Sequence, residues 1–110
     1  MAKPLQPDEI TRAVTVLNAQ AGKVSWKVKD SKLCKMFVFD NFIDAFSWMT
    51  QCAIWAEKLD HHPEWCNVYK RVDVNLITHD AGGLTELDFS LARKMDLCAQ
   101  YFIVEQYKFN

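Results

Sequence analysis

The residues of this chain that are best suited to chemistry are its three histidines, which all lie in one segment. His61 and His62 are adjacent, and His79 follows after a stretch rich in alternating apolar and polar residues. Imidazole transfers protons well because its pKa lies near neutral pH, and it is also a common metal ligand. The cluster therefore predicts a proton-transfer site or a metal site, and a purely structural role for the three side chains is the remaining alternative.

The spacing around the histidines favours proton transfer over metal binding. The H-E-x-x-H spacing of helical zinc sites is absent, and two adjacent residues rarely both point at one ion. The sequence contains no G-x-S-x-G elbow for a nucleophilic serine, and the "AGG" at 81–83 indicates only a turn. We therefore expect acid/base chemistry without a metal or a cofactor, and a three-histidine metalloprotein remains a rival hypothesis.

Carboxylates flank the histidines on both sides. Glu57 and Asp60 precede the adjacent pair, and Asp80 and Asp88 follow the third histidine. Asp88 stands three residues after Thr85, which is the spacing of a capping box, so it could orient an imidazole or only cap a helix. Glu57 either reaches the site from the end of a helix or is solvated. The sequence leaves both pairs of alternatives open.

The bulk properties are those of an ordinary globular protein with one domain over residues 1–110. Half of the residues are apolar, a quarter are charged and the formal net charge is −1, which argues against disorder and direct nucleic-acid binding. No run approaches the ~18 apolar residues of a membrane span, and the N-terminus lacks the apolar core of a signal peptide. We therefore expect a cytoplasmic protein that could also enter the nucleus. Its cysteines would stay reduced and are expected to be small buried hydrophobic residues: Cys34, Cys52, Cys66 and Cys98.

Apolar periodicity predicts the elements that must position these residues. The predicted order is helix 6–20, strands 24–29 and 33–39, helix 41–59, two short strands within 65–78, and helix 86–105. Gly22 is expected to end the first helix. Strands joined by hairpins pair antiparallel, and helices between the strand pairs without βαβ crossovers indicate an α+β fold. We therefore expect a four-stranded antiparallel sheet covered on one face by helices.

The long helix 41–59 is apolar around about half of its circumference, more than the ~100° stripe that packing on one sheet requires. Asp40 is its predicted N-cap. One face carries Phe42, Phe46, Met49, Ala53 and Ala56, and an adjacent face carries Trp48, Cys52, Trp55 and Leu59. Either this helix is wedged deep in its own core, or the second face meets another copy of the chain. We favour self-association, because a two-layer domain offers its outer face no intramolecular partner.

Two stretches carry a family resemblance. "EKLDHHPEWCNVY" and "RVDVNLITHDAGGLTELD" resemble the pterin-4a-carbinolamine dehydratases, also known as the dimerisation cofactor of a homeodomain transcription factor. The pattern H-H-P-E-W-x-N-V-Y followed by T-H is specific, and the match is dense from Glu57 to Asp88. Two departures are mild: Cys66 stands where a larger aromatic residue is common, and Ile77 where a small hydroxylated residue is common.

The resemblance implies an assembly, a reaction and a rival function. In the implied homotetramer, sheets join edge to edge into dimers, and helices 41–59 pair the dimers into a bundle. The implied reaction converts 4a-hydroxytetrahydrobiopterin to quinonoid dihydrobiopterin and water during tetrahydrobiopterin recycling, without metal or cofactor. The rival is an interaction module that binds the dimerisation helix of a transcription factor through helix 41–59. A pure binding module would not need all three histidines, which favours the enzyme.

The resemblance also implies residue roles. His61 and His79 take the acid/base positions, and His62 helps to hold the pterin, so these three form the catalytic set. The polar edge of the ring is expected to meet the backbone around Thr78 and His79. The substrate-binding set is Asp60, His61, His62, Ile77, Thr78, His79 and Asp80. The supporting set is Glu57, Trp65 and Asp88, and Trp65 fits a core position better than an aromatic wall.

Overall fold

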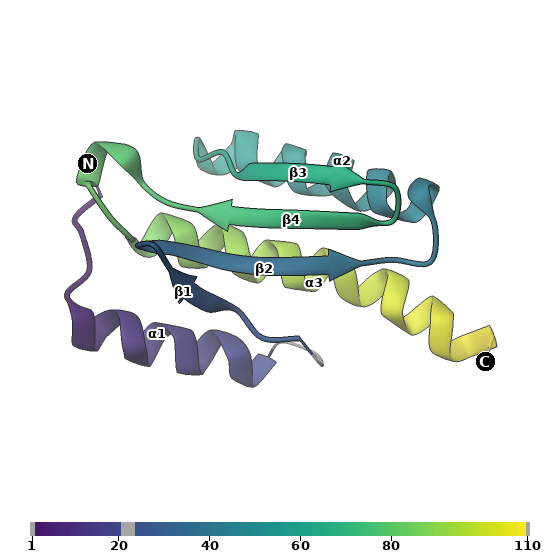
Figure 1. The fold of residues 1–110 in the computed structure, drawn as a ribbon, viewed down its shortest axis with the longest axis horizontal. Coiled ribbons are helices and arrows are strands. Elements are labelled where there is room, and N and C mark those ends of the chain that lie inside the picture. The colour runs from purple at the N-terminus through teal and green to yellow at the C-terminus, as the bar shows by residue number, and fades with distance from the viewer. Residues whose placement is uncertain (1, 21–23, 110) are drawn as a thin grey trace.

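The computed structural model describes residues 2–20 and 24–109, with side chains as far as residue 102. Within these ranges the chain forms an α+β fold in the predicted order α-β-β-α-β-β-α (Figure 1). The elements are α1 (Pro7–Gln20), β1 (Lys27–Lys29), β2 (Lys32–Val38), α2 (Phe42–Leu59), β3 (Glu64–Val68), β4 (Arg71–Leu76), the 3₁₀ helix η1 (His79–Ala81) and α3 (Glu86–Phe109).

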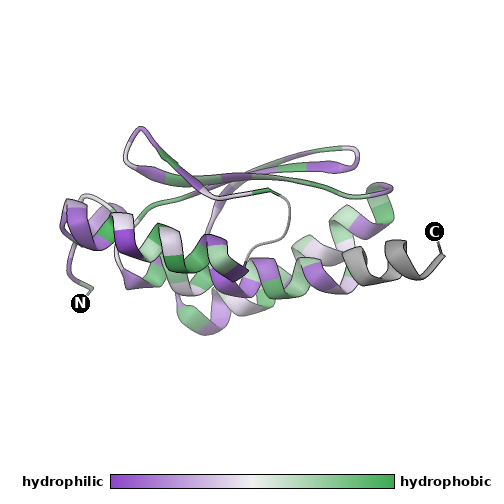
Figure 2. Cartoon of the chain, turned by 90° about the horizontal axis from the view of Figure 1, so that it is seen from below, coloured by the Kyte–Doolittle hydropathy of each residue, from purple (hydrophilic) through white to green (hydrophobic). Residues whose placement is uncertain are grey.

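The four strands form an antiparallel sheet in the order β1-β2-β4-β3, and the helices lie on one of its faces (Figure 2). Three alternate residues of β4, Val72, Val74 and Leu76, are buried against the helices, as the period of two predicts. The residues between them lie on the uncovered face of the sheet: Arg71, Asp73 and Asn75. This arrangement confirms the predicted helix-covered sheet.

The core lies between the sheet and the adjacent helices α2 and α3. Trp48 of α2 is fully buried, and its ring centroid lies 4.4 Å from that of Phe37 on β2. Its indole N–H donates to the carbonyl of Met95 on α3 at 2.9 Å, so the buried polar atom has a partner. Trp48 thus connects α2, β2 and α3, and the histidine segment runs between two of these elements, α2 and α3.

The first strand is shorter than predicted. Only its last three residues belong to β1, whereas the prediction covered residues 24–29. The side chain of Asn18 on α1 forms hydrogen bonds with both backbone polar groups of Trp26: it accepts from the N–H at 2.8 Å and donates to the carbonyl at 3.0 Å. These bonds replace sheet pairing at that point, and Val24 is left exposed. The predicted helix stop at Gly22 lies outside the described residues.

Two helix ends differ from the prediction. The N-cap of α2 is Asn41 rather than Asp40: its backbone is extended, and its side chain accepts from the Asp44 N–H at 2.8 Å. Capping by Asn41 starts the helix at residue 42 and leaves Asp40 exposed. α3 continues to Phe109 rather than ending near residue 105, because no Gly or Pro interrupts that stretch.

The prediction for the outward face of α2 was wrong. Trp48 and Cys52 are fully buried in the chain's own core, and Trp55 and Leu59 pack against that core. The exposed apolar side chains of α2 come from the other face and from positions beside it: Phe42, Ile43, Phe46 and Ile54. Trp48 and Cys52 fill the space between α3 and the sheet, so the exposed apolar surface of α2 lies around Phe42 and Phe46 instead.

The cysteines are free thiols in different environments. Cys52 is buried and Cys34 and Cys98 are partly buried, but Cys66 is exposed, so the prediction of a buried residue was wrong there. Cys66 is opposite Asp73 in the strand register, on the face of the sheet that the helices leave uncovered.

The helices of the described residues include no segment that combines the length and the apolar character needed to cross a bilayer.

Candidate active site

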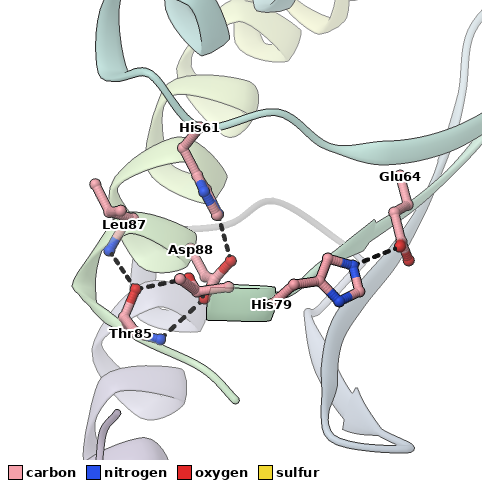
Figure 3. Close-up of polar contacts among 7 residues, drawn as sticks. His61, Glu64, His79, Thr85, Leu87 and Asp88 are labelled. Carbon is pink, nitrogen blue, oxygen red and sulfur yellow. Dashed lines mark hydrogen bonds and ion pairs between the residues drawn. The ribbon is translucent and has the colours of Figure 1, made fainter. Parts of the chain in front are cut away.

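The C-terminal end of α2 positions the first histidine. The Asp60 N–H donates to the Glu57 carbonyl at 3.2 Å, and the His61 N–H donates to the Ala56 carbonyl at 3.0 Å. Asp60 has φ 52° and ψ 43°, the left-handed conformation that closes a Schellman motif and is usually taken by Gly. This motif ends the helix and turns the chain so that His61 points toward the start of α3 (Figure 3).

His61 and Asp88 form a buried imidazole–carboxylate pair. The Nε2 atom of His61 lies 2.6 Å from Oδ1 of Asp88, which is in the first turn of α3. Asp88 is fully buried and His61 is only 8% exposed. The two residues stand 27 positions apart in the sequence, so packing of α2 against α3 creates the pair.

Asp88 both caps α3 and orients the imidazole. Its Oδ2 atom accepts from the Thr85 N–H at 2.9 Å and from the Thr78 hydroxyl at 2.8 Å. The Thr85 hydroxyl lies 2.8 Å from that of Thr78 and accepts from the Leu87 N–H at 3.2 Å (Figure 3). The predicted capping box is therefore present, and both alternatives for Asp88 hold at once.

These contacts assign the tautomer of His61. Every other partner of Asp88 donates to it, so a carboxylate there accepts the proton carried by Nε2. Among the described residues, the ring of His61 forms hydrogen bonds only through Nε2, and no buried polar side-chain atom lacks a partner, so the unpaired Nδ1 is not fully enclosed. The Nδ1 atom is therefore the nitrogen available to a reacting molecule.

His62 pairs with Glu57 at the surface. Its Nε2 atom lies 2.8 Å from Oε1 of Glu57, and both side chains are largely exposed. Pro63 follows directly and keeps His62 out of the helical region, so the ring is presented from a stiff connection between α2 and β3. The contact shows that Glu57 reaches the histidine segment and remains in contact with solvent.

His79 pairs with a carboxylate that the sequence did not single out. Its Nε2 atom lies 3.0 Å from Oε2 of Glu64, the first residue of β3 (Figure 3). The other oxygen of Glu64 accepts from Nζ of Lys32 at 2.6 Å. These two hydrogen bonds, that from Lys32 first, hold the pKa of Glu64 below its usual value. The hydrogen bond between Lys32 and Glu64 also raises the pKa of Lys32.

The loop that carries His79 is closed by its own backbone. Thr78 and Gly83 form an isolated antiparallel bridge, with N···O distances of 3.1 and 3.4 Å. Gly82 has φ 73°, which only Gly adopts readily, and its N–H donates to the His79 carbonyl at 3.0 Å. This tight turn places η1 at the end of the sheet and fixes the backbone position of His79.

All three histidines share one pattern. Each is held through Nε2 by its own carboxylate, and the carboxylates come from α2, β3 and α3. A carboxylate accepts the proton on Nε2 and leaves Nδ1 to accept or donate a proton. The arrangement therefore provides three oriented proton-transfer groups, of which one is buried and two are exposed.

The other predicted site residues lie at the surface or against the core. Asp60 and Asp80 are exposed, and Ile77 is partly buried between β4 and η1. Trp65 is partly buried, and its ring centroid lies 6.2 Å from that of Trp48, which places it against the core as favoured above. Among the described residues, no group of three or more His, Cys, Asp or Glu side chains has the arrangement of a metal site.

Sequence reasoning missed Glu64 and Lys32. Glu64 lies within the H-H-P-E-W pattern, and alternation in β3 would have placed it on the uncovered face of the sheet. No local signal pointed to Lys32. Its contact with Glu64 depends on the strand order of the sheet, in which β4 lies between β2 and β3. The hydroxyl of Thr85 was expected as a cap, but its contact with Thr78 was not.

Comparisons with known proteins identify relatives of this chain. The family model described as "Pterin 4 alpha carbinolamine dehydratase" matches residues 3–98. A Rhizobium etli protein named "Putative pterin-4-alpha-carbinolamine dehydratase" is 63% identical over 81 residues, which are 72% of this chain and 80% of that protein. A Jannaschia protein of the same name is 55% identical over 100 residues, covering 91% of this chain and 100% of that one.

A solved structure has the same fold. A Brucella melitensis protein described as a transcriptional coactivator/pterin dehydratase superposes with a TM-score of 0.80 at 43% identity, covering 88% of this chain and 99% of that one. The family model spans most of the chain and includes every histidine and carboxylate of the candidate site. The chain therefore belongs to the pterin-4a-carbinolamine dehydratase family.

Proposed function

We propose that this protein is a hydro-lyase that dehydrates 4a-hydroxytetrahydrobiopterin to quinonoid dihydrobiopterin in tetrahydrobiopterin recycling. The observation that carries this proposal is the shared pattern of His61, His62 and His79, each oriented by a carboxylate on Nε2. Family membership supports the same reaction class. The chemistry requires only proton transfers, and we propose that it uses no metal or cofactor.

The reaction divides into two proton transfers. The C4a–O bond of the substrate breaks, the oxygen leaves as water after protonation, and the electron pair of the N5–H bond forms the C4a=N5 double bond. One imidazolium protonates the departing hydroxyl, and one neutral imidazole removes the N5 proton. We assign these acid and base positions to His61 and His79, and each could contribute about 10²–10⁴-fold.

Substrate binding is assigned to the residues around these two histidines. His62 projects from the stiff connection after α2 and would hold the pterin ring, with Asp60, Ile77 and Asp80 at the border of the site. The backbone N–H of Thr78 is already bonded to Gly83. Hydrogen bonds to the polar edge of the ring are therefore assigned to the neighbouring His79 N–H rather than to that of Thr78.

The exposed apolar face of α2 supports a proposed assembly. Phe42, Ile43, Phe46 and Ile54 form it, and apolar groups of this kind commonly mark interfaces. We propose a homotetramer in which these faces meet in a helical bundle and the sheets of two copies join at their edges. A second candidate function uses the same face of α2 to bind the dimerisation helix of a transcription factor, and the Brucella melitensis neighbour is described as a coactivator.

The dehydration proposal is tested with substrate generated in place. An aromatic amino acid hydroxylase produces 4a-hydroxytetrahydrobiopterin, and its decay is followed by absorbance with and without this protein. We expect the decay to accelerate in proportion to protein concentration. A matched sample of the folded double variant His61→Ala/His79→Ala should give the uncatalysed rate. Wild-type protein without any acceleration would overturn the proposal.

A further inference from the structure

We propose that Glu64 is a positioning residue for His79 and that Lys32 anchors Glu64, so that a Lys32–Glu64–His79 chain directs one of the two acid/base groups. The inference rests on the proposed dehydratase function. It goes beyond the His79–Glu64 contact described above, because it adds Lys32 from β2 to the site and lets Glu64 of β3 determine which nitrogen of His79 reacts.

The geometry divides the carboxylate of Glu64 between two partners. Its Oε1 atom binds Lys32 at 2.6 Å, and its Oε2 atom binds Nε2 of His79 at 3.0 Å. Glu64 is opposite Asn75 in the strand register, so its side chain starts from the rigid end of β3. Figure 3 shows the His79 ring and the Glu64 side chain directed toward each other from η1 and β3.

His79 needs such an anchor more than His61 does. The pair of His61 and Asp88 is enclosed by packing and by the bonds from Thr78 and Thr85. The side chain of His79 is 69% exposed and could adopt several rotamers in solvent. A single exposed ion pair orders side chains weakly, but a carboxylate already held by a second cation has less freedom left to lose. Lys32 therefore makes Glu64 a fixed acceptor.

The charge of Glu64 decides which nitrogen of His79 reacts. The contacts with Lys32 and His79 hold the pKa of Glu64 below its usual value, so it is a carboxylate at neutral pH. A carboxylate only accepts hydrogen bonds, so it requires the proton on Nε2 and leaves Nδ1 free. A glutamine has the same shape but can turn its NH₂ group toward Nε2, and the choice of nitrogen is then lost.

The kinetic test is a double-mutant cycle. Glu64→Gln should lower kcat by about tenfold, a fraction of the ~10²–10⁴-fold that a positioned acid/base group supplies, with KM nearly unchanged. In the His79→Ala background the same change should have almost no effect, because Glu64 acts through His79. Lys32→Met should lower kcat by a smaller factor. Equal losses in both backgrounds, or no loss in either, would overturn the inference.

Asp73→Asn is the matched control. Asp73 lies on the same uncovered face, its side chain is 39% exposed against 44% for Glu64, and it pairs with Arg71 rather than with a histidine. Its removal should leave kcat unchanged. A loss as large as that of Glu64→Gln would mean that any carboxylate on this face supports the reaction, and would contradict a specific role for Glu64.

A substrate-free measurement separates this inference from the proposed function. Carbon-13 NMR of the side-chain carboxyl of Glu64 should give a pKa below the usual glutamate value in the wild-type protein. Lys32→Met should raise that pKa more than His79→Ala does, because the Lys32 contact is the larger cause. An unchanged Glu64 pKa in Lys32→Met overturns the chain even in an active enzyme. Inactive wild-type protein with the expected NMR shifts overturns the dehydratase proposal instead.

Discussion

His61 at the end of α2 and Asp88 at the start of α3 meet at 2.6 Å, with the carboxylate fully buried. The contact links a helix C-terminus to a helix N-terminus, so the orientation of the His61 imidazole depends on how the two helices pack. Asp88 also satisfies the Thr85 N–H that begins α3. One carboxylate thereby couples the stability of the fold to the geometry of the site.

The first prediction concerns Asp88→Asn. An asparagine can accept from His61 through its oxygen, but its NH₂ group then faces the N–H of Thr85 and the hydroxyl of Thr78, which are donors. We expect a loss of about 1–3 kcal/mol in the free energy of unfolding, because a buried donor is left unsatisfied. Urea denaturation measures this, and the dehydration rate should fall with it.

Glu86→Gln is the control for that change, because it removes an exposed carboxylate from the same first turn of α3. It should cost only a small part of the unfolding free energy lost in Asp88→Asn, since surface substitutions usually have little effect. If Asp88→Asn were as stable and as active as this control, the buried network would have neither of the roles assigned to it.

The second prediction concerns the histidines. His61→Ala and His79→Ala should each lower the dehydration rate by at least about tenfold, and the double variant far more, because each removes one proton-transfer group. His62→Ala should mainly raise KM, since a positioning contact with the substrate is lost. Circular dichroism must show that each variant is folded. A folded double variant with near wild-type turnover would remove the acid/base assignment.

Local patterns explain why much of the site could be predicted. The capping-box spacing of Thr85 and Asp88 placed that carboxylate at a helix start, and Pro63 placed His62 in an extended connection. Strand alternation placed the β4 residues on their faces. The contact between His61 and Asp88 itself depends on helix packing, so the sequence left open whether Asp88 orients an imidazole or only caps α3.

The parts that could not be predicted depend on tertiary structure. The partner of His79 is Glu64, and Lys32 reaches Glu64 across the end of β4, which no local pattern encodes. For α2, both apolar faces satisfy helical periodicity, so the sequence does not show which one packs inward. The structure resolves this by burying Trp48 and leaving Ile43 exposed.

The third prediction concerns assembly. Ile43 is 74% exposed on the free face of α2, so Ile43→Asp should leave the fold intact and split the proposed tetramer. Cys52→Asp should instead unfold the chain, because Cys52 is buried in its own core. Light scattering and thermal melts separate the two outcomes.

Val16→Asp provides the matched control for assembly, since Val16 is an exposed apolar residue on α1. It should leave both the mass and the melting temperature near those of the wild type. A wild-type monomer at micromolar concentration, or an Ile43→Asp variant that remains tetrameric, would show that α2 does not form the interface.

The fourth prediction concerns metal. Prolonged treatment with a strong chelator, followed by exchange into chelator-free buffer, should change neither the dehydration rate nor the melting temperature. The reason is that proton transfer by imidazole requires no Lewis acid. Elemental analysis of the untreated protein completes the measurement. A stoichiometric transition metal whose removal abolishes activity would favour the three-histidine metalloprotein instead.

The last prediction concerns the pH dependence that Glu64 contributes. Its pKa in the folded protein lies below its usual value of 4.5, through the contacts with Lys32 and His79. A carboxyl group with a lowered folded pKa stabilises the fold above its unfolded pKa, and this contribution is lost as the pH falls through the folded pKa. The stability difference between wild type and Glu64→Gln should therefore shrink as the pH falls below 4.5. Thermal melts of both proteins across this range give the difference, and added salt should reduce it because the groups are exposed. A difference that grew as the pH fell below 4.5 would mean that the Lys32–Glu64–His79 contacts do not favour the ionised carboxylate.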